Sequence, residues 1–511
     1  MENFFISTAI SYTNGPPHMG HAYEVIAADV IARFKRLEGK NVFFLTGTDE
    51  HGLKVQKKAI GLGISAQDLA DQMSKNFVEM GKALNCSSDD FIRTSEERHK
   101  VAVKEIWLKM KKNGDIYLDD YSGWYSIIDE AFYQESELIK GDSGIFFSPN
   151  NNPVEWLEEQ SYFFRLSSYE GKLLDLYEKN EIFVQPKSRM NEVRNFVEGG
   201  LKDISISRKG LEWGIKVPDD EGHSVYVWVD ALTNYISALE WPNDKSLFND
   251  FWPGNLHLIG KDIIRFHAVF WPAFLMSAGL EIPKQIFAHG FILNKGEKMS
   301  KSLGNIEDPM SLIKNFGVDQ LRYFLMRETP FGNDGNYSDE LLINRVNADL
   351  SNDLGNLSQR CLTMVKKNCS QSIPQKNELN NVDLELLKSV DQKRDIIINL
   401  MSNFHINLYI SEVFELISNT NKYFSDQKPW DLKTLDNDRM NTVLWVTCEM
   451  LRRIGILLQP VIPSGSSKLL DFLLISEEHR LIKFISDDYS LNSGKPIKEP
   501  EIIFPKIELK K

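Results

Sequence analysis

The feature that most constrains this chain is an apolar strand pattern that runs through a tight loop into a helix pattern, at residues 4–33. Residues 4–10 form a short apolar run, which is typical of a buried strand. Residues 13–17 contain Asn-Gly and Pro-Pro, which favour a loop, and apolar residues then recur on one helical face. A strand that turns into a helix N-terminus makes an anion site, because free N–H groups and the helix dipole face it.

The first turn of this predicted helix reads His18-Met19-Gly20-His21. Residues three apart lie on one side of a helix, so the two imidazoles point together at its positive end. The glycine between them leaves room for a flat ligand such as a nucleotide. On these four residues alone, a chance pair of surface histidines is favoured. A zinc pair is disfavoured, because zinc pairs favour i,i+4 spacing and no third ligand is obvious nearby.

A second strand pattern ends in polar residues. The apolar run at residues 42–45 leads into Gly47-Thr-Asp-Glu-His-Gly52. In a doubly wound α/β sheet, ligands bind outside the carboxyl ends of the strands. Asp49 is therefore a candidate partner for a substrate ammonium group. A helix N-cap is an equally good explanation for an aspartate at this point.

The middle of the chain indicates an interrupted α/β fold. Residues 117–223 are rich in Tyr, Phe and Gly, with short alternating runs, and we predict that they form an inserted subdomain. Strands are predicted at residues 225–230 and 256–260, each followed by a helix, so the second half of the sheet follows the insertion. Residues 338–473 are nearly all helical in period.

A basic, hydroxyl-rich loop follows the apolar run at residues 286–293. It is flanked by Gly296 and Gly304 and carries Lys298 and Lys301. Such a loop can hinge and close over a phosphate, to which lysines add compact positive charge. The alternative is a solvated surface loop, which most loops of this composition are.

Composition limits the possible functions. The chain has 511 residues and a net charge of −13, so it is not a general polyanion binder and would bind nucleic acid only through local patches. Its four cysteines form no CxxC pair, which fits a reducing cytosol. No signal peptide is evident, and the apolar window at residues 263–280 contains Arg265 and His267, which favours a buried helix over a membrane span.

Taken together, the His18–His21 segment and Lys298-Met-Ser-Lys-Ser302 resemble the two signature motifs of class I aminoacyl-tRNA synthetases. The flanking segments at residues 9–15, 48–52, 226–231 and 288–290 are similar to those of the methionyl-tRNA synthetases. The resemblance runs from residue 5 to about residue 463. It implies a split Rossmann catalytic domain with an inserted connective subdomain, followed by an all-α anticodon-binding bundle. The expected boundaries are 1–116 and 225–285 for the two Rossmann halves, 117–224 for the insertion, 286–340 for the stem-contact region and 341–511 for the bundle and tail.

The resemblance implies a reaction in which the methionine carboxylate attacks the α-phosphorus of ATP, giving methionyl-adenylate. The carboxylate is already ionised at neutral pH, so the protein needs only to position it and stabilise charge on phosphate. Mg²⁺ would share the triphosphate charge. The expected catalytic residues are His18, His21, Lys298 and Lys301, and the expected ATP-binding residues are Asn14, Gly20, His21, Lys298, Met299, Ser300, Lys301 and Ser302.

The methionine thioether is only a weak acceptor, so selectivity must come mostly from a shaped apolar and aromatic pocket. Asp49 would pair with the ammonium group. Without the resemblance, ordinary core aromatics would be the favoured explanation for Trp228 and Tyr235. By resemblance the pocket consists of Ile10, Tyr12, Asp49, Trp228, Ala231, Tyr235 and His289. Ser11 stands where related enzymes often carry proline.

In the helical region, the resemblance implies that Asn356, Arg360 and Trp430 read the CAU anticodon of initiator and elongator methionine tRNAs. Asn356 and Arg360 are four apart on one helix face, and Trp430 follows a Lys-Pro turn. Splayed RNA bases stack on aromatic side chains. Taken alone, a surface Asn/Arg pair and a core tryptophan are the simpler explanation.

The chain departs from the family in the insertion. Many relatives carry zinc knuckles there, but Ser126 and Asp129 occupy two expected cysteine positions, and residues 117–223 contain no cysteine. We therefore predict no structural zinc. We also expect a monomer, because the chain lacks the additional domain that dimerises some bacterial relatives.

Three other functions remain open at this point. The first is a class I synthetase for leucine, isoleucine, valine or cysteine, although an insertion of about 100 residues is small for an editing domain. The second is a small-molecule nucleotidylyltransferase, against which the helical C-terminal region argues. The third is a tRNA-binding paralogue without catalysis, which the two intact motifs disfavour.

Overall fold

The computed structural model describes residues 2–128, 131–133, 135–141, 145–299 and 305–508. At its centre is a parallel sheet in the order β10-β16-β15-β1-β3-β2, and β4 pairs with β3. The strands are β1 (Asn3–Thr8), β2 (Ser11–Tyr12), β3 (Asn41–Asp49), β4 (Asp90–Arg93), β10 (Val184–Gln185), β15 (Leu256–Gly260) and β16 (Ile286–His289). Since every pair is parallel, polar residues that follow β1, β3 and β16 lie at one edge.

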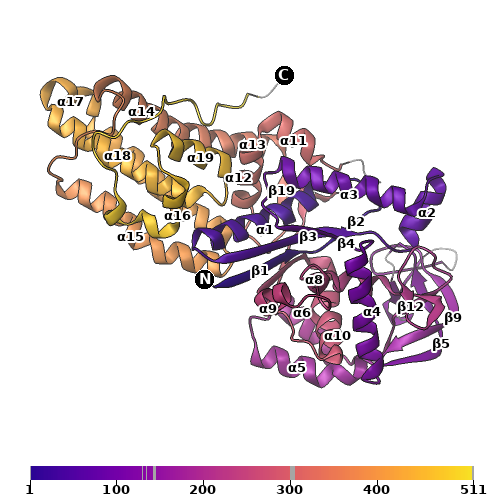
Figure 1. Cartoon of the computed structure of the whole chain (residues 1–511). Helices are drawn as coiled ribbons and strands as arrows, with labels where there is room; N and C mark the ends of the chain where they lie inside the picture. Colours follow the sequence, from indigo (N-terminus) through magenta and orange to yellow (C-terminus); the bar gives the residue numbers. More distant parts are fainter. Residues whose placement is uncertain (1, 129–130, 134, 142–144, 300–304, 509–511) are drawn as a thin grey trace.

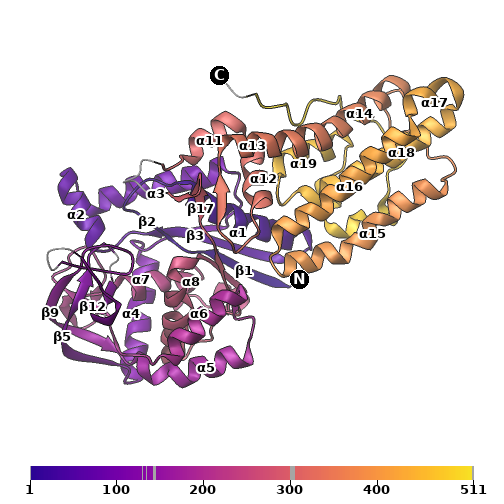
Figure 2. The ribbon, with the colours of Figure 1, turned by 180° about the vertical axis from the view of Figure 1, so that it is seen from behind.

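Successive side chains of β1 point to opposite faces of the sheet, so this strand contributes to two hydrophobic cores. Phe4 and Ile6 face the core that continues through α1 into the C-terminal helices, whereas Phe5 faces the core beneath α4 and α10. Figures 1 and 2 show α1 and α3 on one face of the sheet and α4, α8 and α10 on the other. These helices are α1 (Met19–Leu37), α3 (Ala66–Ala83), α4 (Glu97–Lys112), α8 (Asn234–Ser237) and α10 (Trp271–Ala278).

The region predicted to be inserted forms a separate sheet but also returns to the central one. In the separate sheet, β5 (Ile116–Ser126) pairs with β9 (Glu155–Phe164) and β6 (Ala131–Tyr133), and β11 (Ile204–Ser205) pairs with β9. Strand β10, from the same region, pairs with β16 at the edge of the central sheet. The region predicted to be inserted therefore contributes an edge strand to the central sheet.

One prediction about the sheet was wrong, and one strand was not predicted. Residues 225–230 do not form a strand of the central sheet: β14 (Asp220–Val225) pairs antiparallel with β12 (Ser207–Lys209) and β13 (Lys216–Val217), and α7 (Val227–Leu232) follows. An apolar run of this length fits a short buried helix as well as a strand. The four-residue strand β4 was missed, because it is flanked by long helical patterns.

The C-terminal half is a helical bundle, as predicted, that extends away from the sheet (Figure 1). An extended tail packs on it, where Asn347 and Ile507 exchange two hydrogen bonds of 2.8 Å. The helices from residue 309 onward are α11 (Pro309–Phe316), α12 (Val318–Glu328), α13 (Asp339–Val346), α14 (Asn356–Asn368), α15 (Asn381–Ser402), α16 (Ile406–Gln427), α17 (Pro429–Leu435), α18 (Asn437–Leu458) and α19 (Pro463–Phe472), with a π-helix at Asn347–Gly355.

A buried ion pair joins the bundle to the sheet domain. Asp29 of α1 and Arg322 of α12 are both fully buried, with Oδ2 and Nη2 2.7 Å apart. Arg322 also donates to the carbonyls of Leu84, Pro460 and Val461, and thus reaches the corner between α18 and α19. Burial alone would raise the pKa of Asp29, but the charges of Arg322 and Arg33 outweigh burial and lower this pKa.

We predict that Arg322→Met lowers the free energy of unfolding by about 3–5 kcal/mol, because it leaves the Asp29 carboxylate buried without its main partner. Chemical denaturation followed by circular dichroism measures the loss. Lys179→Met is the control, since Lys179 and Asp175 form an exposed pair worth less than about 1 kcal/mol. Equal effects of the two substitutions would show that the buried pair does not hold the domains together.

Candidate active site

The N-terminus of α1 is closed by its own histidines. The helix begins at Met19, and His18 is its N-cap: His18 Nδ1 accepts from the Gly20 N–H, and the His18 N–H donates to His21 Nδ1, both at 3.1 Å. This reciprocal cap stacks the two rings with centroids 3.8 Å apart. A Cβ on Gly20 would lie 2.9 Å from His18 Cε1, so the glycine makes room for this ring.

The basic loop lies close to the N-terminus of α1. β17 (Ile292–Asn294) and β18 (Glu297–Lys298) form a hairpin, and Met299 packs against the core. Ser300, Lys301 and Ser302 lie outside the described residues. Beyond them, Asn294 Nδ2 donates to the Asn305 carbonyl at 2.9 Å, which joins the two ends of the loop. The Met19 N–H donates to the Glu307 carbonyl at 3.2 Å, so the loop ends at the first turn of α1.

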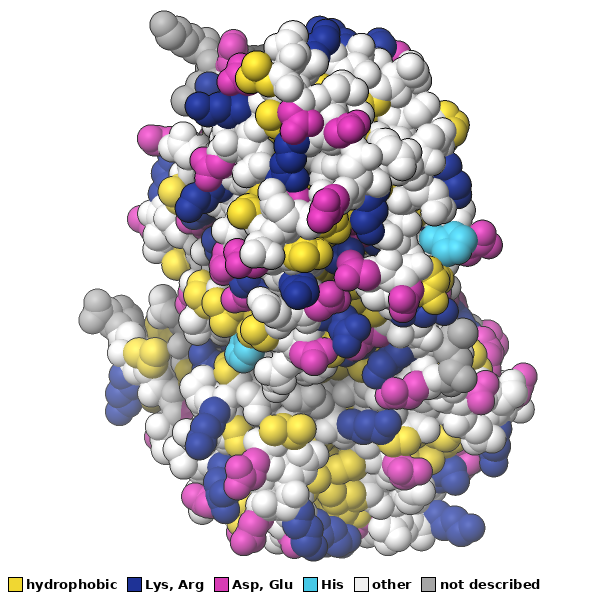
Figure 3. All heavy atoms as spheres, turned by 90° about the vertical axis from the view of Figure 1, so that its left-hand side faces the viewer, with side chains coloured by type: hydrophobic (Ala, Val, Ile, Leu, Met, Phe, Trp, Pro, Cys, Tyr) yellow, Lys and Arg dark blue, Asp and Glu magenta, His cyan; other side chains and the backbone are white. Residues whose placement is uncertain are grey.

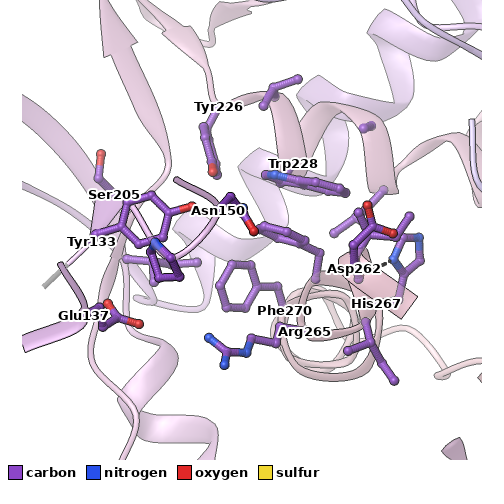
Figure 4. A pocket seen from close by; sticks show the side chains of 18 of the residues that line it. Tyr133, Glu137, Asn150, Ser205, Tyr226, Trp228, Asp262, Arg265, His267 and Phe270 are labelled. Atoms are coloured by element: carbon purple, nitrogen blue, oxygen red, sulfur yellow. Dashed lines mark hydrogen bonds between the residues drawn. The ribbon is translucent and has the colours of Figure 1, made fainter. Parts of the chain in front are cut away.

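A cavity of about 1420 Å³ lies beside the carboxyl ends of β2 and β3, between the central sheet and the inserted region. Figure 4 shows Trp228 at its centre, with Tyr226, Phe270 and Arg265 around it. Seven residues singled out from the sequence line this cavity: Ile10, Tyr12, Asn14, Asp49, Trp228, Ala231 and Tyr235.

Other predicted residues, among them His21 and His289, do not line this cavity. His21 lines a second cavity of about 390 Å³, together with Thr8 and Ser11. His289 is not among the residues that line either cavity, and its Nε2 lies 2.9 Å from Glu24 Oε2. Burial would lower the pKa of His289, but the carboxylate raises it, so the pair favours the charged imidazole.

Asp49 ends β3 and is almost fully buried. The alternative role of helix N-cap is wrong, because the N-cap of α2 (Leu53–Leu62) is Gly52. The Asp49 side chain lines the cavity. It lies at the edge of the sheet where β2 pairs with β3, opposite Tyr12. A carboxylate at this place can receive a cationic ligand group.

Aromatic rings form the opposite wall. Trp228 stacks on Phe266 with ring centroids 3.6 Å apart, and the Tyr235 hydroxyl lies 2.8 Å from His267 Nε2. Burial lowers the pKa of His267 to about 4, so the ring is neutral, and its Nδ1–H donates to the Ile263 carbonyl. The His267 Nε2 then accepts a hydrogen bond from the Tyr235 hydroxyl. Phe266 and His267 were not predicted as site residues, although the polar residues in the apolar window at 263–280 were a signal.

The predicted RNA-binding residues lie at the far end of the bundle, where α14 and α17 meet (Figure 1). The Arg360 guanidinium lies 5.4 Å from the Trp430 ring centroid and 5.1 Å from that of Phe424. Trp430 is 44% exposed, so the alternative of a core tryptophan is wrong. Asn356 is exposed one turn before Arg360. The three side chains therefore share one accessible region.

The inserted region offers no evident metal site in the part described. Ser126 is buried at the end of β5, and Asp129 lies outside the described residues. Among the residues with assigned positions, no three His, Cys, Asp or Glu side chains cluster as metal ligands. Within the same residues, no helix is both long and apolar enough to span a membrane.

Comparison with known proteins identifies the family. The family model for tRNA synthetases class I (M) matches residues 4–145 and 146–362, and that for the anticodon binding domain of methionyl tRNA ligase matches residues 373–511. The methionine–tRNA ligase of Brucella suis biovar 1 is 52% identical, with 99% of this chain and 98% of the relative covered.

Two solved structures have the same fold. Mycobacterium tuberculosis methionyl-tRNA synthetase in complex with methionyl-adenylate matches with a TM-score of 0.96 and 49% identity, over 99% of this chain and 100% of that one. Its apo form matches with a TM-score of 0.90 and 46% identity, over 100% and 99%. This chain belongs to the methionyl-tRNA synthetases, within the class I aminoacyl-tRNA synthetases.

Proposed function

We propose that this protein attaches L-methionine to methionine tRNAs, initiator and elongator, through a methionyl-adenylate. A methionine carboxylate oxygen bonds to the α-phosphorus of ATP, and the bond to the leaving pyrophosphate breaks. The adenosine at the tRNA 3′ end then takes the methionyl group and AMP leaves. The observation that carries this proposal is the cavity with Asp49 on one wall and Trp228 on the other, in a member of this family.

Each end of methionine has a suitable partner in the cavity. Asp49 pairs with the ammonium group and leaves the carboxylate free to react. The rings of Trp228 and Tyr235, with Ile10, Tyr12 and Ala231, enclose the apolar thioether side chain. The thioether accepts hydrogen bonds only weakly, so shape and burial account for most of the selectivity.

ATP binds between the α1 N-terminus and the basic loop. Stacked His18 and His21, with Lys298 and Lys301, stabilise negative charge on the phosphates. Asn14, Gly20, Met299, Ser300 and Ser302 complete this site. Support comes from the hydrogen bond between Met19 and Glu307, which places the end of the loop beside the helix. Mg²⁺ would share the negative charge of the triphosphate.

Recognition of the anticodon is local. On the face that Figure 3 shows, basic and acidic side chains are intermixed over the bundle, with no continuous basic patch. Stacking of an anticodon base on Trp430, with Asn356 and Arg360 bonding to base edges, suits such a surface. We expect a cytosolic monomer without structural zinc.

Amino-acid-dependent ATP–pyrophosphate exchange tests the function directly. We expect exchange with methionine and at most about 1% of that rate with leucine, isoleucine, valine or cysteine, because a shaped pocket discriminates by a few kcal/mol. A higher kcat/KM with any of the four would refute the assignment to methionine.

The basic loop is tested by Lys301→Ala. We predict that exchange falls by about 100-fold or more, because a charge that stabilises the transition state is lost. Lys295→Ala is the matched control: this exposed lysine lies in the turn between β17 and β18, and its loss leaves the rate near that of the wild type. An unchanged rate in Lys301→Ala would contradict the proposed role.

Anticodon stacking is tested by Trp430→Ala. We predict a rise of about 10- to 100-fold in KM for the tRNA in aminoacylation, the cost of one base stack, with unchanged pyrophosphate exchange. Leu435→Ala, on the same helix at 79% exposure, serves as control and leaves both assays unchanged. A parallel loss of exchange in Trp430→Ala would point instead to misfolding.

A further inference from the structure

Behind the large cavity lies a continuous chain of four buried polar side chains, which we name the buried relay: His51, Asp230, His99 and Ser237. His51 Nδ1 lies 2.7 Å from Asp230 Oδ2, and His99 Nε2 lies 2.7 Å from Asp230 Oδ1. His99 Nδ1 lies 2.8 Å from the Ser237 hydroxyl. None of the four side chains is more than 5% exposed.

The relay joins three of the segments that carry the proposed methionine-binding residues. His51 follows Asp49 by two positions, and Asp230 stands between Trp228 and Ala231. Ser237 follows Tyr235 by two positions, on α8. His99 belongs to α4, which packs against both α8 and α10. None of the relay side chains lines the cavity itself.

Asp230 is the member on which the relay depends, because it alone binds both imidazoles. A carboxylate can only accept hydrogen bonds, so His51 Nδ1 and His99 Nε2 both donate to it. Burial would raise the pKa of Asp230, but the two imidazoles lower it to about 2, and it is ionised at neutral pH. Charge-assisted hydrogen bonds in a buried site are strong and directional.

The two helices next to Asp230, α7 and α8, depend on contacts of this kind for their position. α7 has six residues and α8 has four, and neither has a side-chain hydrogen bond at its N-cap. Helices this short have little stability of their own, so tertiary contacts decide where they lie. Asp230 therefore controls how far Trp228 on α7 stands from Asp49 at the end of β3.

We propose that Asp230 is a positioning residue for methionine, which holds the ammonium-binding wall and the aromatic wall of the pocket at the separation that fits the substrate. The inference rests on the proposed function of the cavity. Its consequence is selective: loss of the relay weakens methionine binding but not ATP binding, because no member of the relay belongs to the segments that carry the proposed ATP groups, which are α1, the loop before it and the basic loop.

The test is Asp230→Asn, a substitution that keeps the shape but removes the charge and one of the two acceptors. We expect KM for methionine in pyrophosphate exchange to rise by about 10- to 100-fold, because a small displacement of positioning groups has effects of this size. KM for ATP stays within about twofold of the wild type. Circular dichroism and a melting curve check that the variant is folded.

His51 provides a second, milder pair of variants. His51→Leu removes the donor to Asp230, and we expect a raised KM for methionine. His51→Asn places an amide N–H near the position of Nδ1, and we expect it to restore most of the wild-type value. Rescue by asparagine separates positioning through the hydrogen bond from simple loss of packing.

Glu449→Gln is the matched control. Glu449 is also a fully buried acid with two cationic partners, Arg452 and Arg453, but it lies on α18 in the bundle. This variant lowers the melting temperature and leaves both KM values unchanged.

Three results would overturn the proposal: a folded Asp230→Asn with unchanged KM for methionine, equal rises of both KM values, or no difference between His51→Asn and His51→Leu. The wild-type protein is assayed first. Absence of methionine-dependent exchange in the wild type would refute the proposed function and this inference together, whereas normal wild-type exchange with any of the three results refutes the inference alone.

Discussion

The ion pair between Asp29 and Arg322 is the interaction on which the arrangement of the whole chain depends. It lies in the middle of α1, whose N-terminus carries the stacked histidines. Through Arg322, the same helix is tied to the corner between α18 and α19. A charge pair buried in this way tolerates little displacement, because separation leaves two unsolvated charges. Helix α1 and the helical bundle are therefore joined by a direct, buried contact.

The cavity also depends on contacts between segments that are far apart in the sequence. Parallel strands end at one edge of the sheet, so Tyr12 and Asp49 become neighbours although 37 positions separate them in the chain. The opposite wall comes from α7 and the π-helix at Phe266–Phe270, more than 170 residues further on. Buried polar contacts such as those of Asp230 hold these short helices in place. The architecture combines a rigid sheet with short helices that gain their order from tertiary contacts.

Much of this could be predicted from local patterns. The strand, loop and helix at residues 4–33 were recognisable because an apolar run, a breaker pair and a helical period follow one another. The helical C-terminal region was predicted for the same reason. The run at residues 225–230 was misassigned, since periodicity does not separate a short buried strand from a short buried helix. The contact between His289 Nε2 and Glu24 Oε2, 2.9 Å apart, joins two distant segments and could not be predicted from a local pattern.

By itself, the sequence determined the class of fold, the two motif segments and the chemical types of the site residues. These are local properties, encoded in periodicity, turn residues and the resemblance to a family. Only the tertiary structure decided that His18 caps its own helix, that Trp228 stacks on Phe266 and that Asp230 joins two histidines. These contacts form only when packing and burial bring the residues together. The pKa of a buried group depends on its neighbours in space, which cannot be predicted from a local sequence pattern.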